Sequence, residues 1–405
     1  MTILKNKIYL LFLSSVLILG LTTACDSNKS EPEEPSAPRE ALLDLVFPTR
    51  SVGIDMTEKE LDPLENYFTP EESYLIIEQR TQNHSLSFEE NISDTNPNGF
   101  LYKYVWKKGE NDKGTEANTV ISGDTPNWND GYNFTALPAW NNPMKWETIL
   151  SNGAIGTDYA FGALYYPVDN GGRRDIETDQ STLEGLKKSN ILGTYHSTST
   201  PYERLRFRLY HLMACMRVTI WVPVEKTDET GQTGYKGVRK INATMLNLIK
   251  DFNIEWGSLP SDYPPSLMAD TETGVAGKIS MYPHTAPTES KNVDITVFGL
   301  EGTDDVYEYT FTGLFPPQTI SNTADVLQFD IMNENGRQIV ASYTWSTAQL
   351  MSNLEVNSGT ITNLILYFPR GENTALLVKS EILDWEQADT VVTVTPDNDS
   401  SSKHD

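Results

Sequence analysis

The residues that most often carry out catalysis are sparse in this sequence and lie far apart. Metalloprotease, redox and nucleophile-elbow motifs (H-E-x-x-H, C-x-x-C and G-x-S-x-G) are missing, and so is the phosphate-binding G-x-x-x-x-G-K loop. The five histidines show no pair at helical metal-binding spacing: His84, His196, His211, His284 and His404. We therefore expect no enzymatic activity, no metal site and no cofactor.

Two single residues could still do chemistry. Cys215 lies in an apolar stretch, where a lone cysteine is most simply a small buried side chain; a catalytic nucleophile is the alternative. His211 stands where the apolar alternation of this stretch changes phase, which favours a structural hydrogen bond over a role as a ligand.

A polar region holds the two remaining candidates for a binding site. Residues 124–131 gather Asp and Asn oxygens as a calcium loop would, but they miss the EF-hand spacing, and turn chemistry explains the same residues. An aromatic platform for sugars could form from Trp128, Tyr132, Trp140 and Trp146. Burial of these rings in a core is the alternative.

The N-terminus predicts export. Lys5 and Lys7 precede a short apolar run, residues 8–21, which small residues follow up to Cys25. This pattern describes a signal peptide over residues 1–24, and the cysteine resembles the acylated first residue of bacterial lipoproteins. We expect Cys25 to be lipidated, with an ordinary signal peptide as the alternative. Residues 25–40 are acidic and proline-rich and form a tether, either a spacer or a surface-export signal.

Charge and cysteine content limit the partners. The formal net charge is −25, so the chain is a poor nucleic-acid binder and is repelled by anionic lipid heads. Membrane contact must then come through the lipid anchor. Of the two cysteines, Cys25 and Cys215, lipidation uses the first, so no disulfide within the mature chain is expected.

A stretch near the middle of the chain organises the fold. From Leu212 to Val224 every second residue is apolar, which is the period of a strand with one face in a core. Leu205, Phe207 and Leu209 alternate in the opposite phase, so a bulge or a break is expected near residue 210. A helix would place several of the same residues on one face, but the β-branched run before Pro223 favours a strand.

Short strands separated by polar turns recur along the rest of the chain, which predicts an all-β protein built from β-sandwiches. Leu43, Leu45 and Phe47 suggest a first strand that ends at Pro48, and residues 391–395 suggest a last one. Residues 346–354 could form one helix. We place an N-terminal β domain at 41–224, a C-terminal β domain at 225–395 and a disordered tail at 396–405.

Several landmarks occur in order behind the lipidation motif. They are Tyr165-Tyr-Pro167, His211-x-x-Ala214-x-x-x-Val218, Phe315-Pro-Pro-Gln318 and a closing strand that ends at Trp385. Together they resemble the fimbrillin superfamily, the pilus subunits and surface adhesins of Gram-negative anaerobes. The resemblance implies two tandem transthyretin-like (Ig-like) β-sandwich domains, no cofactor and no catalysis.

The resemblance also implies a mode of assembly. In that family an arginine-specific protease often removes the first strand, and a strand of the next subunit fills the groove. Arg50 lies where such a cut would fall, Arg39 is an alternative site, and residues 391–395 are a candidate donor strand. An uncut, anchored lipoprotein that keeps its strand is the other possibility.

We expect a non-enzymatic pilus subunit or pilus-like adhesin on the surface of the outer membrane, with other pilus subunits as partners. A surface glycan-binding lipoprotein that uses the tryptophans of residues 128–146 is the rival hypothesis.

Overall fold

The computed structural model describes residues 39, 41–48, 73–86, 100–108, 119–120, 132–136, 144–166, 174–228, 231–256, 265–296, 300, 302–350, 352–370, 373–384 and 389–394. The chain divides into two units, residues 1–39 and 40–405, and every described strand and helix belongs to the second. Among these residues no helix is long and apolar enough to cross a membrane.

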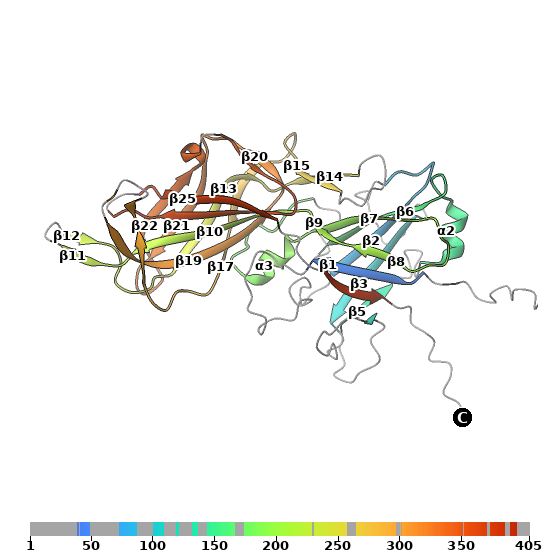
Figure 1. Ribbon diagram of the computed structural model, residues 1–405, viewed down its shortest axis with the longest axis horizontal. Helices are drawn as coiled ribbons and strands as arrows, with labels where there is room; N and C mark the ends of the chain where they lie inside the picture. Colours follow the sequence, from blue (N-terminus) through green and yellow to red (C-terminus); the bar gives the residue numbers. More distant parts are fainter. Residues whose placement is uncertain are drawn as a thin grey trace, which may run out of the picture. The chain divides into compact units, whose positions relative to one another are not determined.

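Strands dominate the second unit, which confirms the all-β prediction (Figure 1). One sheet has the order β4 (Thr119–Val120), β26 (Asp389–Val394), β1 (Leu43–Pro48), β8 (Leu205–Arg208). Another has the order β5 (Tyr132–Ala136), β3 (Leu101–Lys108), β2 (Ser73–Arg80), β6 (Tyr159–Tyr166), β7 (Leu192–Thr198), β9 (Tyr210–His211).

These two sheets share one hydrophobic core. Leu43 of β1 and Phe207 of β8 lie in it together with Leu75 of β2 and Phe161 of β6. The rings of Phe161 and Phe207 meet edge to face with their centroids 6.2 Å apart. Each sheet buries alternate side chains against the other, as in a β-sandwich. Helix α2 (Trp146–Asn152) contributes Trp146 and Ile149 to the same core.

Two further sheets contain most of the later strands. The first has the order β17 (Tyr282–Pro283), β19 (Thr303–Phe315), β10 (Ala214–Pro223), β24 (Thr360–Tyr367), β25 (Leu376–Asp384), and β18 (Lys291–Asp294) also pairs with β19. The second has the order β16 (Ala276–Ser280), β13 (Ile241–Ile249), β21 (Asp325–Met332), β22 (Ile339–Ser346). Phe311 of β19 and Phe329 of β21 pack with ring centroids 6.1 Å apart, so the two sheets bury a common core.

The remaining elements are short. The described part of the chain contains three two-stranded pairs: β11 (Lys226–Asp228) with β12 (Gly231–Thr233), β14 (Phe252–Glu255) with β15 (Ser266–Ala269), and β20 (Gln318–Ile320) with β23 (Leu354–Val356). Helix α3 covers Leu183–Lys188. The helix expected at residues 346–354 is wrong: a single 3-10 turn at Thr347–Gln349 is followed by β23, because Ser346 caps only that one turn.

The central stretch forms a strand as predicted, and the expected break lies between β8 and β10, with β9 in the gap. Strand β10 pairs antiparallel with β19 on one side and parallel with β24 on the other. Both edges of β10 are therefore paired. On its second face Cys215 is buried in a small cluster with Leu186, Leu314 and Ile361.

The sequence predicts a domain boundary between residues 224 and 225. The number of domains stays a prediction, but strands on the two sides of this boundary pair with each other. Strand β10 ends before that boundary and pairs with β19 and β24, which come after it. Strand β26, near the C-terminus, pairs with β1, the first described strand. Ladder bonds are formed with the nearest suitable strand in space, so strand pairing can cross a boundary drawn from composition.

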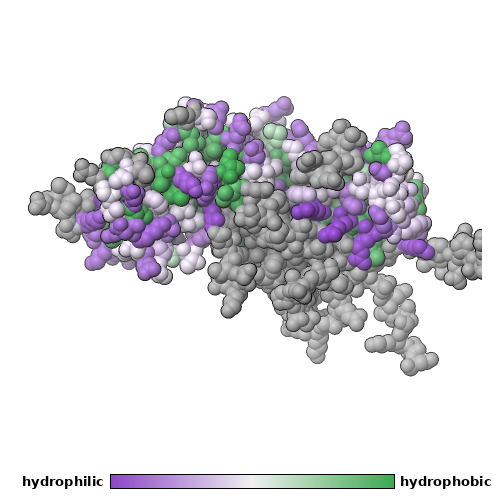
Figure 2. Space-filling model, in the orientation of Figure 1, coloured by the Kyte–Doolittle hydropathy of each residue, from purple (hydrophilic) through white to green (hydrophobic). Residues whose placement is uncertain are grey.

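Figure 2 shows hydrophilic and hydrophobic residues interspersed on the face in view. Several large apolar side chains are exposed among the described residues: Tyr202, Val238, Met268, Val275, Leu300, Ile339, Val340 and Ile382. Such exposed apolar residues are common on folded proteins and do not by themselves define an interface.

Candidate functional site: the first strand and a loop pocket

Strand β1 lies between two strands from distant parts of the sequence. It pairs antiparallel with β26 from Leu43 opposite Val394 to Pro48 opposite Asp389. On its other side it pairs parallel with β8 from Leu43 opposite Leu205 to Val46 opposite Arg208 (Figure 1). Among the described strands β8 has no other ladder partner, so β1 alone satisfies that edge.

The chain leading into β1 is held by backbone contacts and by burial. The Ala41 N–H donates to the Met144 carbonyl at 2.8 Å, and the Leu205 N–H donates to the Leu42 carbonyl at 2.8 Å. Ala41 and Leu43 are buried in the core between the two sheets. The first strand predicted from the sequence is therefore present and is an integral part of its sheet.

The neighbouring strand shows what β1 helps to cover. Leu205 and Phe207 of β8 are fully buried, whereas Arg206 and Arg208, which alternate with them, are exposed. The ladder places Leu43 beside Leu205 and residue 45 beside Phe207. Departure of β1 would leave unpaired backbone groups on β8 and an opening over this core, which is the arrangement that strand addition requires.

The residues expected to be modified lie mostly beyond the described part of the chain. Cys25 and Arg50 are outside the described residues, so lipidation and cleavage stay predictions. Arg39, the alternative cleavage site, is described and exposed. Both arginines flank β1 in sequence, one on each side.

One of the four residues that could form an aromatic platform, Trp146, is buried and cannot belong to such a platform. Trp146 begins α2 and is buried, and its ring meets the Tyr159 ring edge to face with centroids 5.9 Å apart. It therefore belongs to the core, the alternative recognised from the sequence. Trp128 and Trp140 lie outside the described residues, as does the 124–131 loop, and the side chain of Tyr132 is not described either.

Cys215 and His211 have structural roles. Burial raises the pKa of the Cys215 thiol to about 12, so it stays protonated near neutral pH and is a poor nucleophile. The buried His211 ring places Nδ1 2.9 Å from Asn190 Oδ1, the structural hydrogen bond that was expected. Within the described residues no group of three or more His, Cys, Asp or Glu side chains could hold a metal ion.

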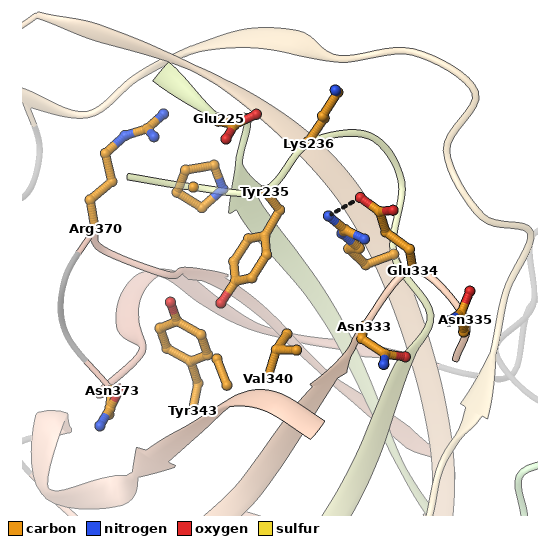
Figure 3. Close-up of a pocket in the computed structure, with 14 residues that line it drawn as sticks. Glu225, Tyr235, Lys236, Asn333, Glu334, Asn335, Val340, Tyr343, Arg370 and Asn373 are labelled. Atoms are coloured by element: carbon orange, nitrogen blue, oxygen red, sulfur yellow. Dashed lines mark hydrogen bonds and ion pairs between the residues drawn. The ribbon is translucent and has the colours of Figure 1, made fainter. Parts of the chain in front are cut away.

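A second site was not anticipated from the sequence. Four segments of the later sheets meet around a pocket of about 760 Å³: the end of β10, the loop between β12 and β13, the loop between β21 and β22, and the chain after β24 (Figure 3). The hydroxyls of Tyr235 and Tyr343 point toward one another within it. Burial, followed by the hydrogen bond with Tyr343, raises the pKa of Tyr235, so the Tyr235 phenol stays neutral.

Each wall of the pocket is fixed from behind. The Tyr343 ring stacks on Phe368 with centroids 4.2 Å apart. Tyr235 is held by its backbone, which donates to the Pro223 carbonyl at 3.0 Å and accepts from the Glu225 N–H at 3.0 Å. Arg239 Nη2 lies 3.2 Å from Glu334 Oε1, and its backbone N–H donates to the Tyr309 hydroxyl at 2.8 Å.

Arg370 forms the remaining wall through an ion pair with a buried carboxylate. Its Nη2 donates to Asp304 Oδ1 at 2.8 Å and its Nε donates to Oδ2 at 3.2 Å. Gly234 makes this approach possible: its φ is +98°, and a Cβ there would lie 2.5 Å from Arg370 Nη1 and 2.4 Å from the Val224 carbonyl oxygen. The sequence signal was a glycine in a polar break, which by itself indicates only a turn.

Comparison with known proteins adds similarities of fold. The sequence matches no protein-family model and no curated protein. A structure from Bacteroides ovatus, described as a candidate cell adhesion protein, covers 86% of this chain and 98% of its own at 12% identity, with a TM-score of 0.44. One from Bacteroides uniformis, described in the same words, covers 85% and 99% at 12% identity, with a TM-score of 0.39. The tip fimbrial protein Mfa3 from Porphyromonas gingivalis covers 86% and 100% at 8% identity, with a TM-score of 0.35. These descriptions apply to those proteins, and what is proposed for the present chain rests on its own residues.

Proposed function

We propose that the protein is a non-enzymatic pilus subunit or pilus-like surface adhesin that is assembled by strand exchange. The observation that carries this proposal is the position of β1, which is the first described strand and the only described ladder partner of β8. One cut after Arg50 would separate β1 from every later element. A terminal strand can leave its sheet without threading any connection through the fold.

Strand exchange would then proceed by replacement. With β1 gone, β8 would present unpaired N–H and C=O groups beside the buried Leu205 and Phe207. A strand from the next subunit would pair with these backbone groups and cover these two side chains again. Backbone ladder bonds would supply affinity, and apolar residues at alternate positions would set the register. Strand β26 is the candidate donor, because it lies near the C-terminus and already pairs with β1 in the isolated chain.

Export and anchoring would come from the N-terminus. A lipid on Cys25 would hold the protein at the outer surface of the outer membrane, and the acidic residues 26–40 would act as the tether. The net charge of −25 opposes direct contact with anionic lipid, so the lipid would be the sole membrane contact. An uncut chain would remain an anchored surface lipoprotein, whereas a cut chain would be free to enter a fibre.

The test combines mass analysis with cleavage. Intact mass and N-terminal sequence of the protein from its native membrane should show either a lipidated Cys25 or a terminus at Ser51. An arginine-specific protease should then cut the lipidated form once near β1 and produce a ladder of oligomers on size-exclusion chromatography with light scattering.

Matched variants identify the cleavage site. Arg50→Lys keeps the charge but removes the arginine-specific cut and should block assembly, whereas Arg39→Lys should leave assembly unchanged. Cut protein that has lost β1 yet stays monomeric at high concentration would rule out strand exchange. Assembly blocked by Arg39→Lys alone would move the cut to the other side of the strand.

A further inference from the structure

The pocket between Tyr235 and Tyr343 has the chemistry of a ligand site, and nothing about β1 explains it. None of the segments that line it pairs with β1, β8 or β26. Four segments, most of them loops, converge on it at the ends of the later strands, and loops on a rigid sheet scaffold are where binding groups are commonly placed. Its volume of about 760 Å³ lies within the usual range for small-molecule sites.

The lining mixes hydrogen-bond donors and acceptors. Arg239, Arg370 and Lys236 can only donate, whereas the carboxylates of Glu225 and Glu334 only accept. The tyrosine hydroxyls and the carboxamide of Asn335 can do both. A hydroxyl group on a ligand needs one acceptor and up to two donors, and this lining offers both kinds side by side.

The lining carries charges of both signs. Three cations, Lys236, Arg239 and Arg370, face two carboxylates, Glu225 and Glu334, while the buried Asp304 behind them pairs with both Arg370 and Lys226. Glu334 is itself paired with Arg239. An anionic ligand would meet these carboxylates, and an apolar ligand would leave the polar groups without hydrogen-bond partners, which is unfavourable.

One polar atom at the site lacks a partner among the described residues. Arg239 Nε is buried and makes no hydrogen bond there, although Nη2 of the same side chain binds Glu334. Buried donors in folded proteins are nearly always satisfied, so an unpaired one beside a pocket indicates a missing partner.

We propose that this pocket binds an uncharged saccharide, whose hydroxyl groups exchange hydrogen bonds with the mixed lining while the half-buried Tyr235 ring contacts an apolar face of the sugar. The site would give a surface adhesin a recognition function in a sheet separate from the one that contains β1. It does not depend on strand exchange, and the failure of either proposal leaves the other intact.

The experiment measures sugar binding by saturation-transfer NMR with the full chain. The probes are methyl glycosides of glucose, galactose and mannose, and glucuronate serves as the acidic comparison. At least one neutral glycoside should bind, and glucuronate should bind at least about fivefold more weakly. Tyr235→Phe and Tyr343→Phe keep both rings but remove the hydroxyls, and each should weaken binding about fivefold, the effect of one lost hydrogen bond.

Controls separate this pocket from binding elsewhere. Lys236→Ala and Asn335→Ala alter exposed pocket residues that should not affect folding, and both should weaken binding. Lys278→Ala removes an equally exposed lysine on β16, and Tyr282→Phe removes a hydroxyl on β17; neither lies at the pocket, and both should bind as the unchanged protein does. No binding of any neutral probe, stronger binding of glucuronate, or equal binding by pocket and control variants would each overturn the proposal.

Discussion

Asp304 accepts hydrogen bonds from Arg370 through both of its carboxylate oxygens, with Nη2 to Oδ1 at 2.8 Å and Nε to Oδ2 at 3.2 Å. The Asp304 side chain is buried, and the Tyr367 hydroxyl also donates to it at 3.0 Å. Asp304 is the second residue of β19, whereas Arg370 follows β24, so the pair joins the ends of two strands that flank β10. The same pair holds the Arg370 side chain in its position at the pocket that Tyr235 and Tyr343 also line.

Removing the carboxylate should destabilise the fold more than removing an exposed partner. Asp304→Ala leaves the largely buried Arg370 uncompensated and should lower the free energy of unfolding by about 3 kcal/mol. Lys226 also contacts Asp304, at 2.7 Å, but its side chain is 47% exposed, so Lys226→Ala should cost less than about 1 kcal/mol. Urea unfolding followed by circular dichroism measures both, and equal losses would show that burial of the pair is unimportant.

The contribution of Asp304 should depend on pH in a definite direction. Burial raises the pKa of Asp304, but hydrogen bonds from Arg370, Lys226 and Tyr367 and the charge of Arg370 outweigh it, so the net pKa lies below the usual value. A carboxylate with a lowered pKa in the folded state stabilises the fold above its unfolded pKa of about 3.9 and loses this effect as the pH falls through the lower folded value.

The unchanged protein and Asp304→Asn should therefore differ in unfolding free energy by a constant amount above about pH 5 and by progressively less below about pH 4. Urea unfolding of both proteins between about pH 3 and 7 gives the difference directly. A difference that grows as the pH falls would contradict the assigned direction of the pKa shift.

Cys215 should be unreactive until the protein unfolds. Its thiol is fully buried in β10 and burial raises its pKa to about 12, so little thiolate is present at pH 8 and reagents cannot reach it. Iodoacetamide should leave Cys215 unmodified in the folded protein and alkylate it in urea, as peptide mass analysis would show. The exposed thiol of a Lys278→Cys variant is the positive control in the same sample. Rapid labelling of Cys215 in the folded state would instead revive a role for it as a nucleophile.

The sequence was sufficient to identify individual strands because alternation is a local signal. The period of two from Leu212 onward predicts β10, and the residues 391–395 predict β26 to within two residues. Pairing is not local: β10 takes one neighbour from β19 and another from β24, and β26 pairs with β1 across most of the chain. The contacts that select these partners are made by residues far apart in sequence, so no spacing pattern reveals them.

The pocket was missed for the same reason. Tyr235, Glu334, Tyr343 and Arg370 come from separate segments that have no common motif. The polar break around Tyr235 is typical of a connection between domains. Only the structure shows that this break and the β21–β22 loop line the same pocket. Trp146 is a case in which the sequence left both a sugar platform and burial open, and the structure decides for burial, because helix α2 turns its ring into the core.

A close backbone approach makes Gly185 difficult to replace. A Cβ at this position of α3 would lie 2.0 Å from the Asp179 carbonyl oxygen, so the chain before the helix would have to move. That chain holds Gln180, whose side chain bonds both backbone groups of Leu314 in β19, donating at 2.8 Å and accepting at 2.7 Å. Gly185→Ala should therefore lower the free energy of unfolding by about 2 kcal/mol.

Gly277→Ala in β16 is the matched control for this substitution, because a Cβ there meets nothing within 4 Å. It should change the unfolding free energy by less than about 0.5 kcal/mol in the same urea titration. Similar losses in the two variants would contradict an origin in the contact with Asp179, because the change in backbone entropy from Gly to Ala by itself favours the folded state.

Locking β1 in place should prevent assembly even after cleavage. Asp44 of β1 lies opposite Arg206 of β8 in the ladder, so Asp44→Cys with Arg206→Cys would place two thiols on paired residues. Once mass analysis shows the disulfide, cutting at Arg50 should leave β1 attached and the protein monomeric. Reduction with dithiothreitol should then release the strand and restore oligomers, whereas Asp44→Cys alone should assemble under both conditions. Oligomers formed by the cut, oxidised double variant would mean that β1 need not leave its sheet, and that subunits join through some other surface.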